Sequence, residues 1–234
     1  MTYPFLKAVL FDLDGTFLDT SQDMAQALNL LLAEHGRAPL HYEQIRPQVS
    51  HGALGLLDLG FQISPEHAEF AALRARYLEL YETCMFEQTR AFDGIDQILR
   101  YCGQHDLAWG IVTNKPRYLT DKILRHLGYW PQASAIIAGD DLPQRKPHPA
   151  PLLKAAELSN IDAAACCYIG DAERDIRAGK NAGMRTITAR WRVTRASGRR
   201  YSAREARCQW TRPKNCWPCS PRCPSGLCWG TGER

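Results

Sequence analysis

Short runs of consecutive apolar residues recur along the first 191 positions and predict buried β-strands. Each run is bounded by polar or turn-forming residues, a pattern typical of strands that are covered on both faces of a parallel sheet. The five runs are residues 7–11, 107–112, 134–138, 165–169 and 184–189.

Between these runs, apolar positions follow the three- and four-residue spacing of amphipathic helices. One predicted helix follows Asp19 or Thr20 as its cap and stops at Gly36, and another opens at Ser64. A fourth helix closes at Gly128. The predicted buried stripes are Met24, Ala27, Leu28, Leu31 and Leu32; Phe70, Leu73, Tyr77, Leu80, Tyr81 and Cys84; Ile95, Ile98, Leu99 and Cys102; and Leu119, Ile123, Leu124 and Leu127.

The alternation of strands and helices predicts an α/β fold, with a doubly wound parallel sheet covered by helices on both faces. Residues 18–92, however, supply only helical patterns, and they are too many for a single crossover between the first two strands. We therefore expect a helical cap subdomain at 18–92. It would be inserted into an α/β core made of residues 1–17 and 93–191.

The composition is that of a folded protein of one large domain, with 45% hydrophobic and 23% charged residues in 234 positions. No stretch approaches the roughly 20 uncharged residues of a membrane helix. Lys7, Asp12 and Asp14 interrupt the first apolar run, which argues against a signal peptide. We expect a cytoplasmic protein without a membrane partner.

The last 43 residues differ in composition from the rest of the chain. Residues 192–234 carry nine arginines and one lysine against two glutamates, and they hold five of the nine cysteines. Val193 and Leu227 are their only large aliphatic residues, so they lack the periodicity of a helix or strand. We interpret this segment as an aberrant, irregular tail that is disordered or arises from a frameshift near Trp191. Zinc binding through Cys216, Cys219 and the later cysteines is an alternative, as is nucleic-acid binding by the basic segment.

Polar residues follow four of the predicted strands at their carboxyl ends, which meet in one crevice of a parallel sheet. Carboxylates that converge there need a cation, and their hard oxygens favour Mg²⁺. A bound Mg²⁺ with open positions implies an anionic substrate, most often a phosphate. Lys146, stiffened by Pro147 and Pro149, is a candidate to face the same site. The strand-end residues are Asp12 and Asp14; Thr113 and Asn114; Asp140 and Asp141; and Gly170, Asp171 and Asp175.

Four of these segments resemble the motifs of haloacid dehalogenase superfamily phosphatases. Residues 11–16, Phe-Asp-Leu-Asp-Gly-Thr, are similar to the first motif, and residues 112–116, Val-Thr-Asn-Lys-Pro, to the second. Lys146-Pro147 resembles the third motif and residues 170–175, Gly-Asp-Ala-Glu-Arg-Asp, the fourth. Their order and spacing match over residues 5–191, and each motif lies at the end of a predicted strand or before a helix.

The resemblance implies an Mg²⁺-dependent phosphatase with an aspartyl-phosphate intermediate. Asp12 would be the nucleophile and Asp14 the general acid and base. Thr113 and the backbone amide of Asn114 would bind the phosphoryl oxygens, and Lys146 would neutralise charge. The same resemblance implies Mg²⁺ held by the side chain of Asp12, the backbone carbonyl of Asp14 and Asp171, with Asp175 as a further ligand or an anchor behind them.

Two groups of acidic residues leave a simpler interpretation open. Asp175 lies near Arg174 and Arg177, so it could be an ordinary charge on a helix face. Asp140 and Asp141 fit solvated loop acids at least as well as site residues.

The resemblance also points to the predicted cap for substrate choice. Residues 49–53, Val-Ser-His-Gly-Ala, lie between two helical patterns and are expected to form a cap loop facing the site, with Arg46 nearby. Arg46, Ser50 and the Gly52 amide could bind a substrate carboxylate or hydroxyl groups. An ordinary loop between helices is the alternative.

The pattern resembles phosphoglycolate phosphatases and, nearly as well, N-acetylmuramic acid 6-phosphate phosphatases of cell-wall recycling. We therefore expect a small phosphorylated metabolite as the substrate, 2-phosphoglycolate before the amino sugar, and a role in carbohydrate metabolism as a monomer or homodimer. A sugar phosphomutase is a further possibility within the family. The alternative from another class is an inactive or unstable product whose basic tail binds nucleic acid, a partner that we do not expect.

Overall fold

The computed structural model describes residues 6–190 of the chain. The basic segment from Trp191 onward, with the frameshift, zinc and nucleic-acid interpretations attached to it, lies outside the described residues. Within this range, no helix is both long enough and apolar enough to cross a membrane.

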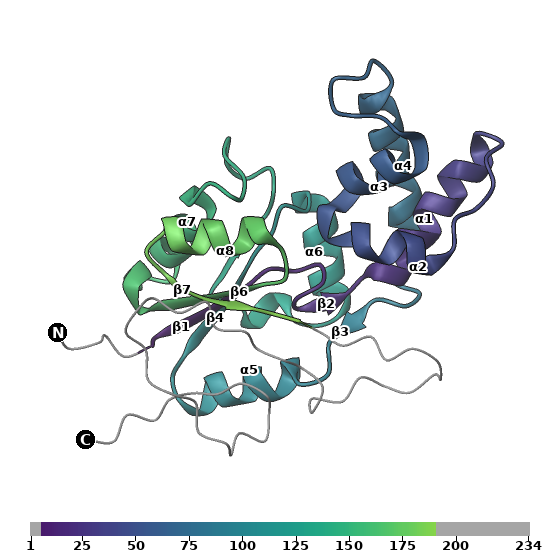
Figure 1. Ribbon diagram of the computed structural model, residues 1–234. Helices are drawn as coiled ribbons and strands as arrows, with labels where there is room; N and C mark the ends of the chain where they lie inside the picture. Colours follow the sequence, from purple (N-terminus) through teal and green to yellow (C-terminus); the bar gives the residue numbers. More distant parts are fainter. Residues whose placement is uncertain (1–5, 191–234) are drawn as a thin grey trace.

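Five parallel strands form the central sheet, in the order β5-β4-β1-β6-β7 (Figure 1). All five predicted strands are present, and the predicted α/β fold class with a doubly wound parallel sheet is confirmed. In register, Phe11 lies between Ile111 and Ile169, so these three strands end together at one edge. The strands are β1 (Ala8–Phe11), β4 (Ala108–Val112), β5 (Ala135–Ile137), β6 (Cys166–Gly170) and β7 (Arg185–Thr188).

Helices cover both faces of the sheet because alternate residues of β1 point to opposite sides. Val9 and Phe11 pack with α5 (Ile95–Gln104) and α6 (Arg117–His126). Ala8 and Leu10 pack with α7 (Ala150–Leu158) and α8 (Glu173–Asn181) on the other face (Figure 1). The sheet core thus has two apolar layers, and only the strand ends are left for polar chemistry. Short 3₁₀ helices η2 (Trp130–Gln132) and η3 (Ala163–Ala165) precede β5 and β6.

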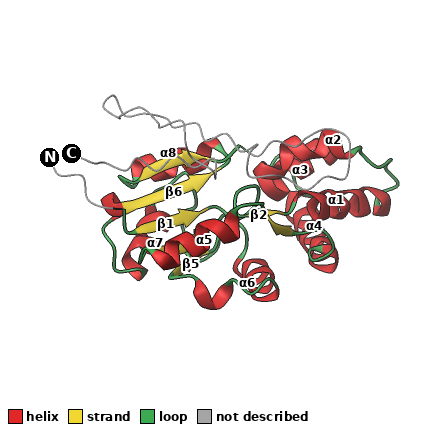
Figure 2. Ribbon diagram, turned by 90° about the horizontal axis from the view of Figure 1, so that it is seen from below, coloured by secondary structure: helices red, strands yellow, loops and turns green. Residues whose placement is uncertain are grey.

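Residues 18–92, called the cap below, form a helical body beside the carboxyl edge of the sheet (Figure 2). Its helices enclose an apolar core of their own, in which Leu28, Leu57 and Tyr77 are buried. Leu119 of α6 packs into the same cluster and so joins the cap to the rest of the protein. The cap elements are α1 (Ser21–Glu34), α2 (Tyr42–Ile45), η1 (Arg46–His51), α3 (Gly52–Phe61) and α4 (Phe70–Cys84).

Three details of the cap differ from the prediction. The helix predicted to open at Ser64 is α4, which begins at Phe70, and the intervening residues form turns. Residues 49–53 are not a loop: they end η1 and begin α3, with Gly52 at a φ of 64° between them. The ends of the cap are not helical either, because β2 (Leu18–Asp19) and β3 (Arg90–Ala91) pair as a short antiparallel ribbon.

Asp23 fastens the two chain segments that connect the cap to the sheet domain. Its carboxylate is fully buried near the start of α1 and accepts hydrogen bonds from the backbone N–H groups of Gln88 and Thr89, both at 2.9 Å. The Thr89 hydroxyl donates a third bond at 2.7 Å. The carboxylate therefore holds the outgoing segment before β3 against the incoming helix.

We expect Asp23→Ala to lower the free energy of unfolding by about 3 kcal/mol, because it leaves two backbone N–H groups without their charged acceptor. Urea unfolding followed by circular dichroism measures this loss. Asp58→Ala, on the exposed face of α3, is the matched control and should change stability by less than about 0.5 kcal/mol. Equal stability of the two variants would show that the Asp23 bonds do not fasten the cap.

Candidate active site

The site begins where β1 ends. The backbone N–H of Asp12 continues the pairing with β6 by donating to Ile169 O at 2.8 Å, and the chain then turns sharply at Gly15, where φ is 83°. A Cβ at Gly15 would lie 2.6 Å from Oδ2 of Asp171. Only glycine fits this turn and this close approach. The turn thus brings the first acidic motif against the end of β6.

Asp12 and Lys146 form the buried centre of the site. Lys146 Nζ donates to Asp12 Oδ1 at 2.7 Å and pairs with Asp175 Oδ1 at 2.8 Å, and its side chain is 0% exposed. The Leu13 N–H donates to the same Asp12 Oδ1 at 2.8 Å. Asp12 Oδ2 accepts no hydrogen bond from the described residues. One oxygen of Asp12 is therefore fixed and the other is available.

Tyr168 of β6 is a further hydrogen-bond partner of the Lys146 ammonium. Lys146 Nζ donates to the Tyr168 hydroxyl at 2.8 Å, and this hydroxyl donates to Val112 O at 2.7 Å. Burial, followed by the charges of Asp175 and Asp12, raises the pKa of Tyr168 well above its ordinary value, so the phenol remains neutral. The lysine is thus held by the sheet itself.

Asp171, at the start of the loop after β6, receives bonds from both parts of the protein. The Thr16 hydroxyl donates to its Oδ1 at 3.2 Å, and the hydroxyl of Ser50 in the cap donates to its Oδ2. Burial, followed by the negative charge of Asp12, raises the pKa of Asp171 to about 6. The cap therefore contacts the Asp171 carboxylate, which accepts hydrogen bonds from two neutral hydroxyl groups.

The carboxylates of Asp12, Asp171 and Asp175 can each direct one oxygen to a common point, since these oxygens lie within 4.8 Å of one another. Burial and the charge of Asp12 also raise the pKa of Asp175, against the opposing effect of Lys146. Three hard oxygen donors that repel each other are the ligand set of a divalent cation. The cluster fits a metal site on its donor chemistry and on its charge.

Asp14 lies apart from this cluster and has its own partners. Its Oδ1 accepts the Thr20 hydroxyl and the Lys115 ammonium, both at 2.8 Å. Oδ2 accepts no hydrogen bond within the described chain. These contacts involve only the side chain of Asp14, so they leave its backbone carbonyl as a predicted metal ligand.

Thr113 and Asn114 leave β4 at the same edge. Thr113 is buried, and its Oγ1 accepts the N–H of Lys115 at 3.1 Å. The Asn114 side chain is paired with the backbone of Lys146: Nδ2 donates to Lys146 O at 3.0 Å, and Oδ1 accepts Lys146 N–H at 3.1 Å. The side chain of Asn114 thus fixes the lysine loop.

The predicted cap residues occupy different places. Ser50 reaches the site through Asp171. Arg46, at the start of η1, is partly buried next to Tyr42, and its Nε has no hydrogen-bond partner among residues 6–190. A Cβ at Gly52 would meet no atom within 4 Å, so what favours glycine at this position is its positive φ of 64°.

Asp140 and Asp141 are loop acids that bind Arg117 and do not join the acidic cluster. Asp140 Oδ1 accepts the Arg117 N–H at 2.7 Å, and Asp141 pairs with the guanidinium. His148 is exposed and its Nδ1 accepts the N–H of Ala150 at 3.2 Å, which is a capping contact.

Several residues of the site were not singled out by the sequence analysis. Lys115 belongs to the second motif but was given no role there, and Thr16 belongs to the first. Tyr168 is the one phenol inside an apolar strand run, a pattern that could have drawn attention to it. Tyr81 of α4, which accepts a hydrogen bond from Lys115, was predicted only as part of a buried helix stripe. Arg174 of α8, whose charge interacts with those of Asp12, Asp175 and Asp171, has no feature in the sequence that separates it from ordinary helix residues.

Comparisons with known proteins agree with this geometry. The family model for haloacid dehalogenase-like hydrolases matches residues 9–189. A phosphoglycolate phosphatase from Xanthomonas campestris is 43% identical over 190 residues, which cover 80% of this chain and 84% of that protein. An N-acetylmuramic acid 6-phosphate phosphatase from Pseudomonas putida is 37% identical over 186 residues, covering 80% and 83%.

Among solved structures, CbbY from Rhodobacter sphaeroides, crystallised in complex with phosphate, has the same fold. It superposes with a TM-score of 0.67 at 21% identity and covers 82% of this chain and 90% of its own. The family match spans most of the chain, and the relatives at 43% and 37% identity are phosphatases. The chain therefore belongs to the haloacid dehalogenase-like hydrolase family and is a phosphatase.

Proposed function

We propose that this phosphatase hydrolyses 2-phosphoglycolate, with Asp12 as the nucleophile and Mg²⁺ as the metal. The observation that carries the proposal is the state of the Asp12 carboxylate: its Oδ1 is held by Lys146 and the Leu13 N–H, while its Oδ2 accepts no hydrogen bond within residues 6–190. Such a fixed carboxylate can direct Oδ2 at phosphorus. Attack forms an aspartyl-phosphate and expels the alkoxide, so that one difficult hydrolysis becomes two easier steps.

Lys146 is suited to stabilise the charge that develops in both steps. Its ammonium is fully buried, where an electrostatic interaction is stronger than in water. Its contacts with Asp175 and Tyr168 keep it in place, so it does not have to reorganise as the reaction proceeds. Thr113 and the backbone amide of Asn114, at the end of β4, would hold the phosphoryl oxygens.

Asp14 would supply and recover the proton. Its Oδ1 is fixed by Thr20 and Lys115, which leaves Oδ2 for the leaving group. In the first step, protonated Asp14 donates to the departing alkoxide oxygen. In the second, the same carboxylate takes a proton from the water that attacks the aspartyl-phosphate.

Asp12, Asp171, Asp175 and the backbone carbonyl of Asp14 would hold Mg²⁺. Burial, followed by the negative charge of Asp12, raises the pKa of Asp171 and of Asp175, and a bound cation would stabilise their ionised forms. When bound, the ion supplies charge neutralisation for the phosphate and the carboxylates.

The choice of 2-phosphoglycolate rests on the relatives and on the cap. The relative with 43% identity acts on phosphoglycolate, and the one with 37% on N-acetylmuramic acid 6-phosphate. The cap comes within hydrogen-bond reach of Asp171 through Ser50, which favours the smaller substrate. Arg46 lies beside Tyr42 in the cap, and its guanidinium has the chemistry to bind a substrate carboxylate. The amino-sugar phosphate is the second candidate.

We expect phosphate release from 2-phosphoglycolate in the presence of Mg²⁺, and a loss of at least about a thousandfold in Asp12→Asn, because the amide is not a nucleophile. A colorimetric phosphate assay with N-acetylmuramic acid 6-phosphate as a parallel substrate measures both. Faster turnover of the amino sugar would replace the first candidate by the second. Full activity of Asp12→Asn would contradict the mechanism.

We also expect Mg²⁺ to raise the melting temperature of the protein in the absence of substrate. At a hundred times Kd the gain is about 2.7 kcal/mol, or roughly 5–10 °C for a protein of this size. Asp171→Asn removes a ligand and should abolish most of the shift in a thermal-shift assay. Asp106→Asn, on an exposed turn with a φ of 52°, is the matched control and should keep it. An unchanged shift in Asp171→Asn would place the ion elsewhere.

A further inference from the structure

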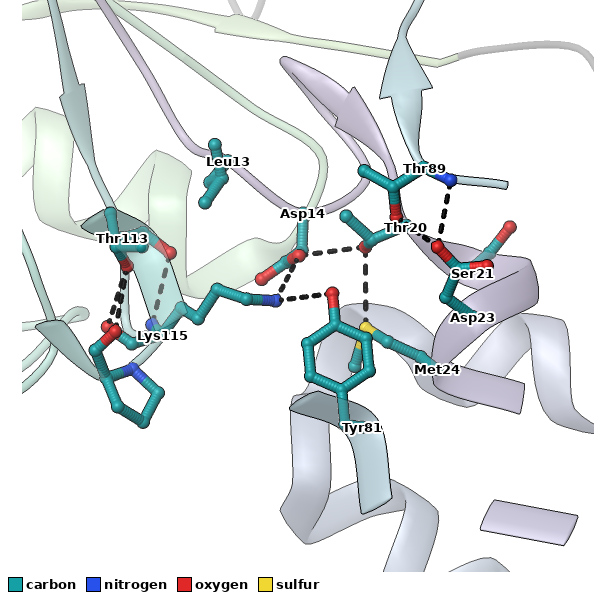
Figure 3. A network of polar contacts seen from close by, with 12 residues as sticks. Leu13, Asp14, Thr20, Ser21, Asp23, Met24, Tyr81, Thr89, Thr113 and Lys115 are labelled. Atoms are coloured by element: carbon teal, nitrogen blue, oxygen red, sulfur yellow. Dashed lines mark hydrogen bonds and ion pairs between the residues drawn. The ribbon is translucent and has the colours of Figure 1, made fainter. Parts of the chain in front are cut away.

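Lys115 extends from the end of β4 to the boundary between the sheet domain and the cap (Figure 3). Its backbone is fixed at both polar groups: the N–H donates to Thr113 Oγ1 at 3.1 Å, and the carbonyl accepts the N–H of Gly139 at 2.8 Å. The side chain is 5% exposed. A charge that is this well buried needs specific partners.

The Lys115 ammonium has two polar partners, and they come from different parts of the protein. It donates to Asp14 Oδ1 at 2.8 Å and to the Tyr81 hydroxyl of α4 at 3.0 Å. It also lies 4.4 Å from the centroid of the Tyr81 ring, a cation–π distance. Figure 3 shows the ammonium between the carboxylate and the phenol. The mechanism above assigns no reacting atom to this lysine.

Tyr81 is a rigid partner for the ammonium. It is 1% exposed in the cap core, and burial, followed by the charges of Asp14 and Asp23, raises its pKa well above the ordinary value. The hydroxyl is therefore neutral and can accept a hydrogen bond from the lysine ammonium. Because α4 carries Tyr81, the position of the cap determines where the ammonium is held.

We propose that Lys115 is a positioning residue, which orients the general acid Asp14 and couples that orientation to the cap through Tyr81. The inference rests on the proposed role of Asp14. Asp14 has a short side chain with two rotatable bonds, and Lys115 is its only charged partner among the described residues. Without the ammonium, only the Thr20 hydroxyl restrains Oδ1. The carboxyl group can then turn, and Oδ2 leaves the direction of the leaving group.

The leaving group provides a test that separates positioning from a merely structural role. Expulsion of phenolate needs a proton more than expulsion of 2,4-dinitrophenolate does, because the more acidic phenol leaves as a stable anion. Loss of an aligned acid therefore slows phenyl phosphate selectively. A residue that binds the phosphoryl group or supports the fold affects both esters alike. These esters also report on Lys115 if 2-phosphoglycolate is not the natural substrate.

The experiment compares kcat/KM for phenyl, 4-nitrophenyl and 2,4-dinitrophenyl phosphate in the full chain. We expect Lys115→Met to lower kcat/KM about a hundredfold for phenyl phosphate, as the loss of an aligned acid does, and less than fivefold, roughly, for the dinitrophenyl ester. Asp14→Asn is the reference for complete loss of the acid. Equal losses across the three esters in a folded Lys115→Met protein would overturn the proposal.

Lys122→Met is the matched control. Lys122 of α6 also contacts α4, by pairing with Glu82, but its side chain is 51% exposed, whereas that of Lys115 is 5% exposed. The control should leave kcat/KM for every ester within about twofold of the wild type. A selective loss for phenyl phosphate in Lys122→Met would show that any contact with the cap can orient Asp14. That result would contradict a specific role of Lys115.

Tyr81→Phe tests the connection to the cap without removing a charge. It keeps the ring but loses the hydroxyl, so we expect a selective loss for phenyl phosphate that is smaller than in Lys115→Met. In the double variant Tyr81→Phe should add little to Lys115→Met, because both act on one carboxylate. Fully additive losses, or no effect of Tyr81→Phe on the leaving-group dependence, would overturn the coupling to the cap. Melting curves of all variants establish that they are folded.

Discussion

Repulsion among carboxylates at the carboxyl edge of the sheet is the constraint on which the rest of the site depends. Parallel strands end together there, so acidic residues that follow different strands are forced close to each other. The chain opposes this repulsion with cationic side chains, of which Lys115 and Lys146 are buried and each bind a carboxylate oxygen. Four carboxylates face three cations: Asp12, Asp14, Asp171 and Asp175 against Lys115, Lys146 and Arg174. The remaining imbalance is what a divalent cation removes.

The cap takes part in the same electrostatic balance. Ser50 donates a hydrogen bond to Asp171, and Thr20 donates one to Asp14. The Tyr81 hydroxyl accepts a hydrogen bond from the Lys115 ammonium. Ser50 and Thr20 thus contact groups that the proposed chemistry uses, and Tyr81 contacts the lysine that holds one of them. The position of the cap and the arrangement of the reacting groups are therefore parts of one structure, and a lid that merely excluded water would not need such contacts.

The sheet could be predicted from the sequence because its strands are buried on both faces and appear as continuous apolar runs. The cap was harder to predict: Ser64-Pro65 has the composition of a helix start, yet the helix begins at Phe70, and residues 49–53, predicted as a loop, end η1 and begin α3. The acidic positions of the candidate site could also be predicted, since they follow strands. Their partners could not, because Lys115 and Asp14 are 101 residues apart and no local pattern joins them.

The two buried lysines, Lys115 and Lys146, have partners of the same kind, but the tyrosines come from different parts of the protein. This difference has a functional consequence. Each ammonium binds one oxygen of an aspartate and a tyrosine hydroxyl. Lys146 is held by Tyr168 of β6, inside the sheet, so the proposed nucleophile Asp12 keeps this support independently of the cap. Lys115 stands on Tyr81 of α4, so the alignment of Asp14 depends on the cap. On the proposed mechanism, a displaced cap would leave Asp12 in place but remove the support of Asp14, so efficient proton transfer would depend on the contact between Lys115 and Tyr81.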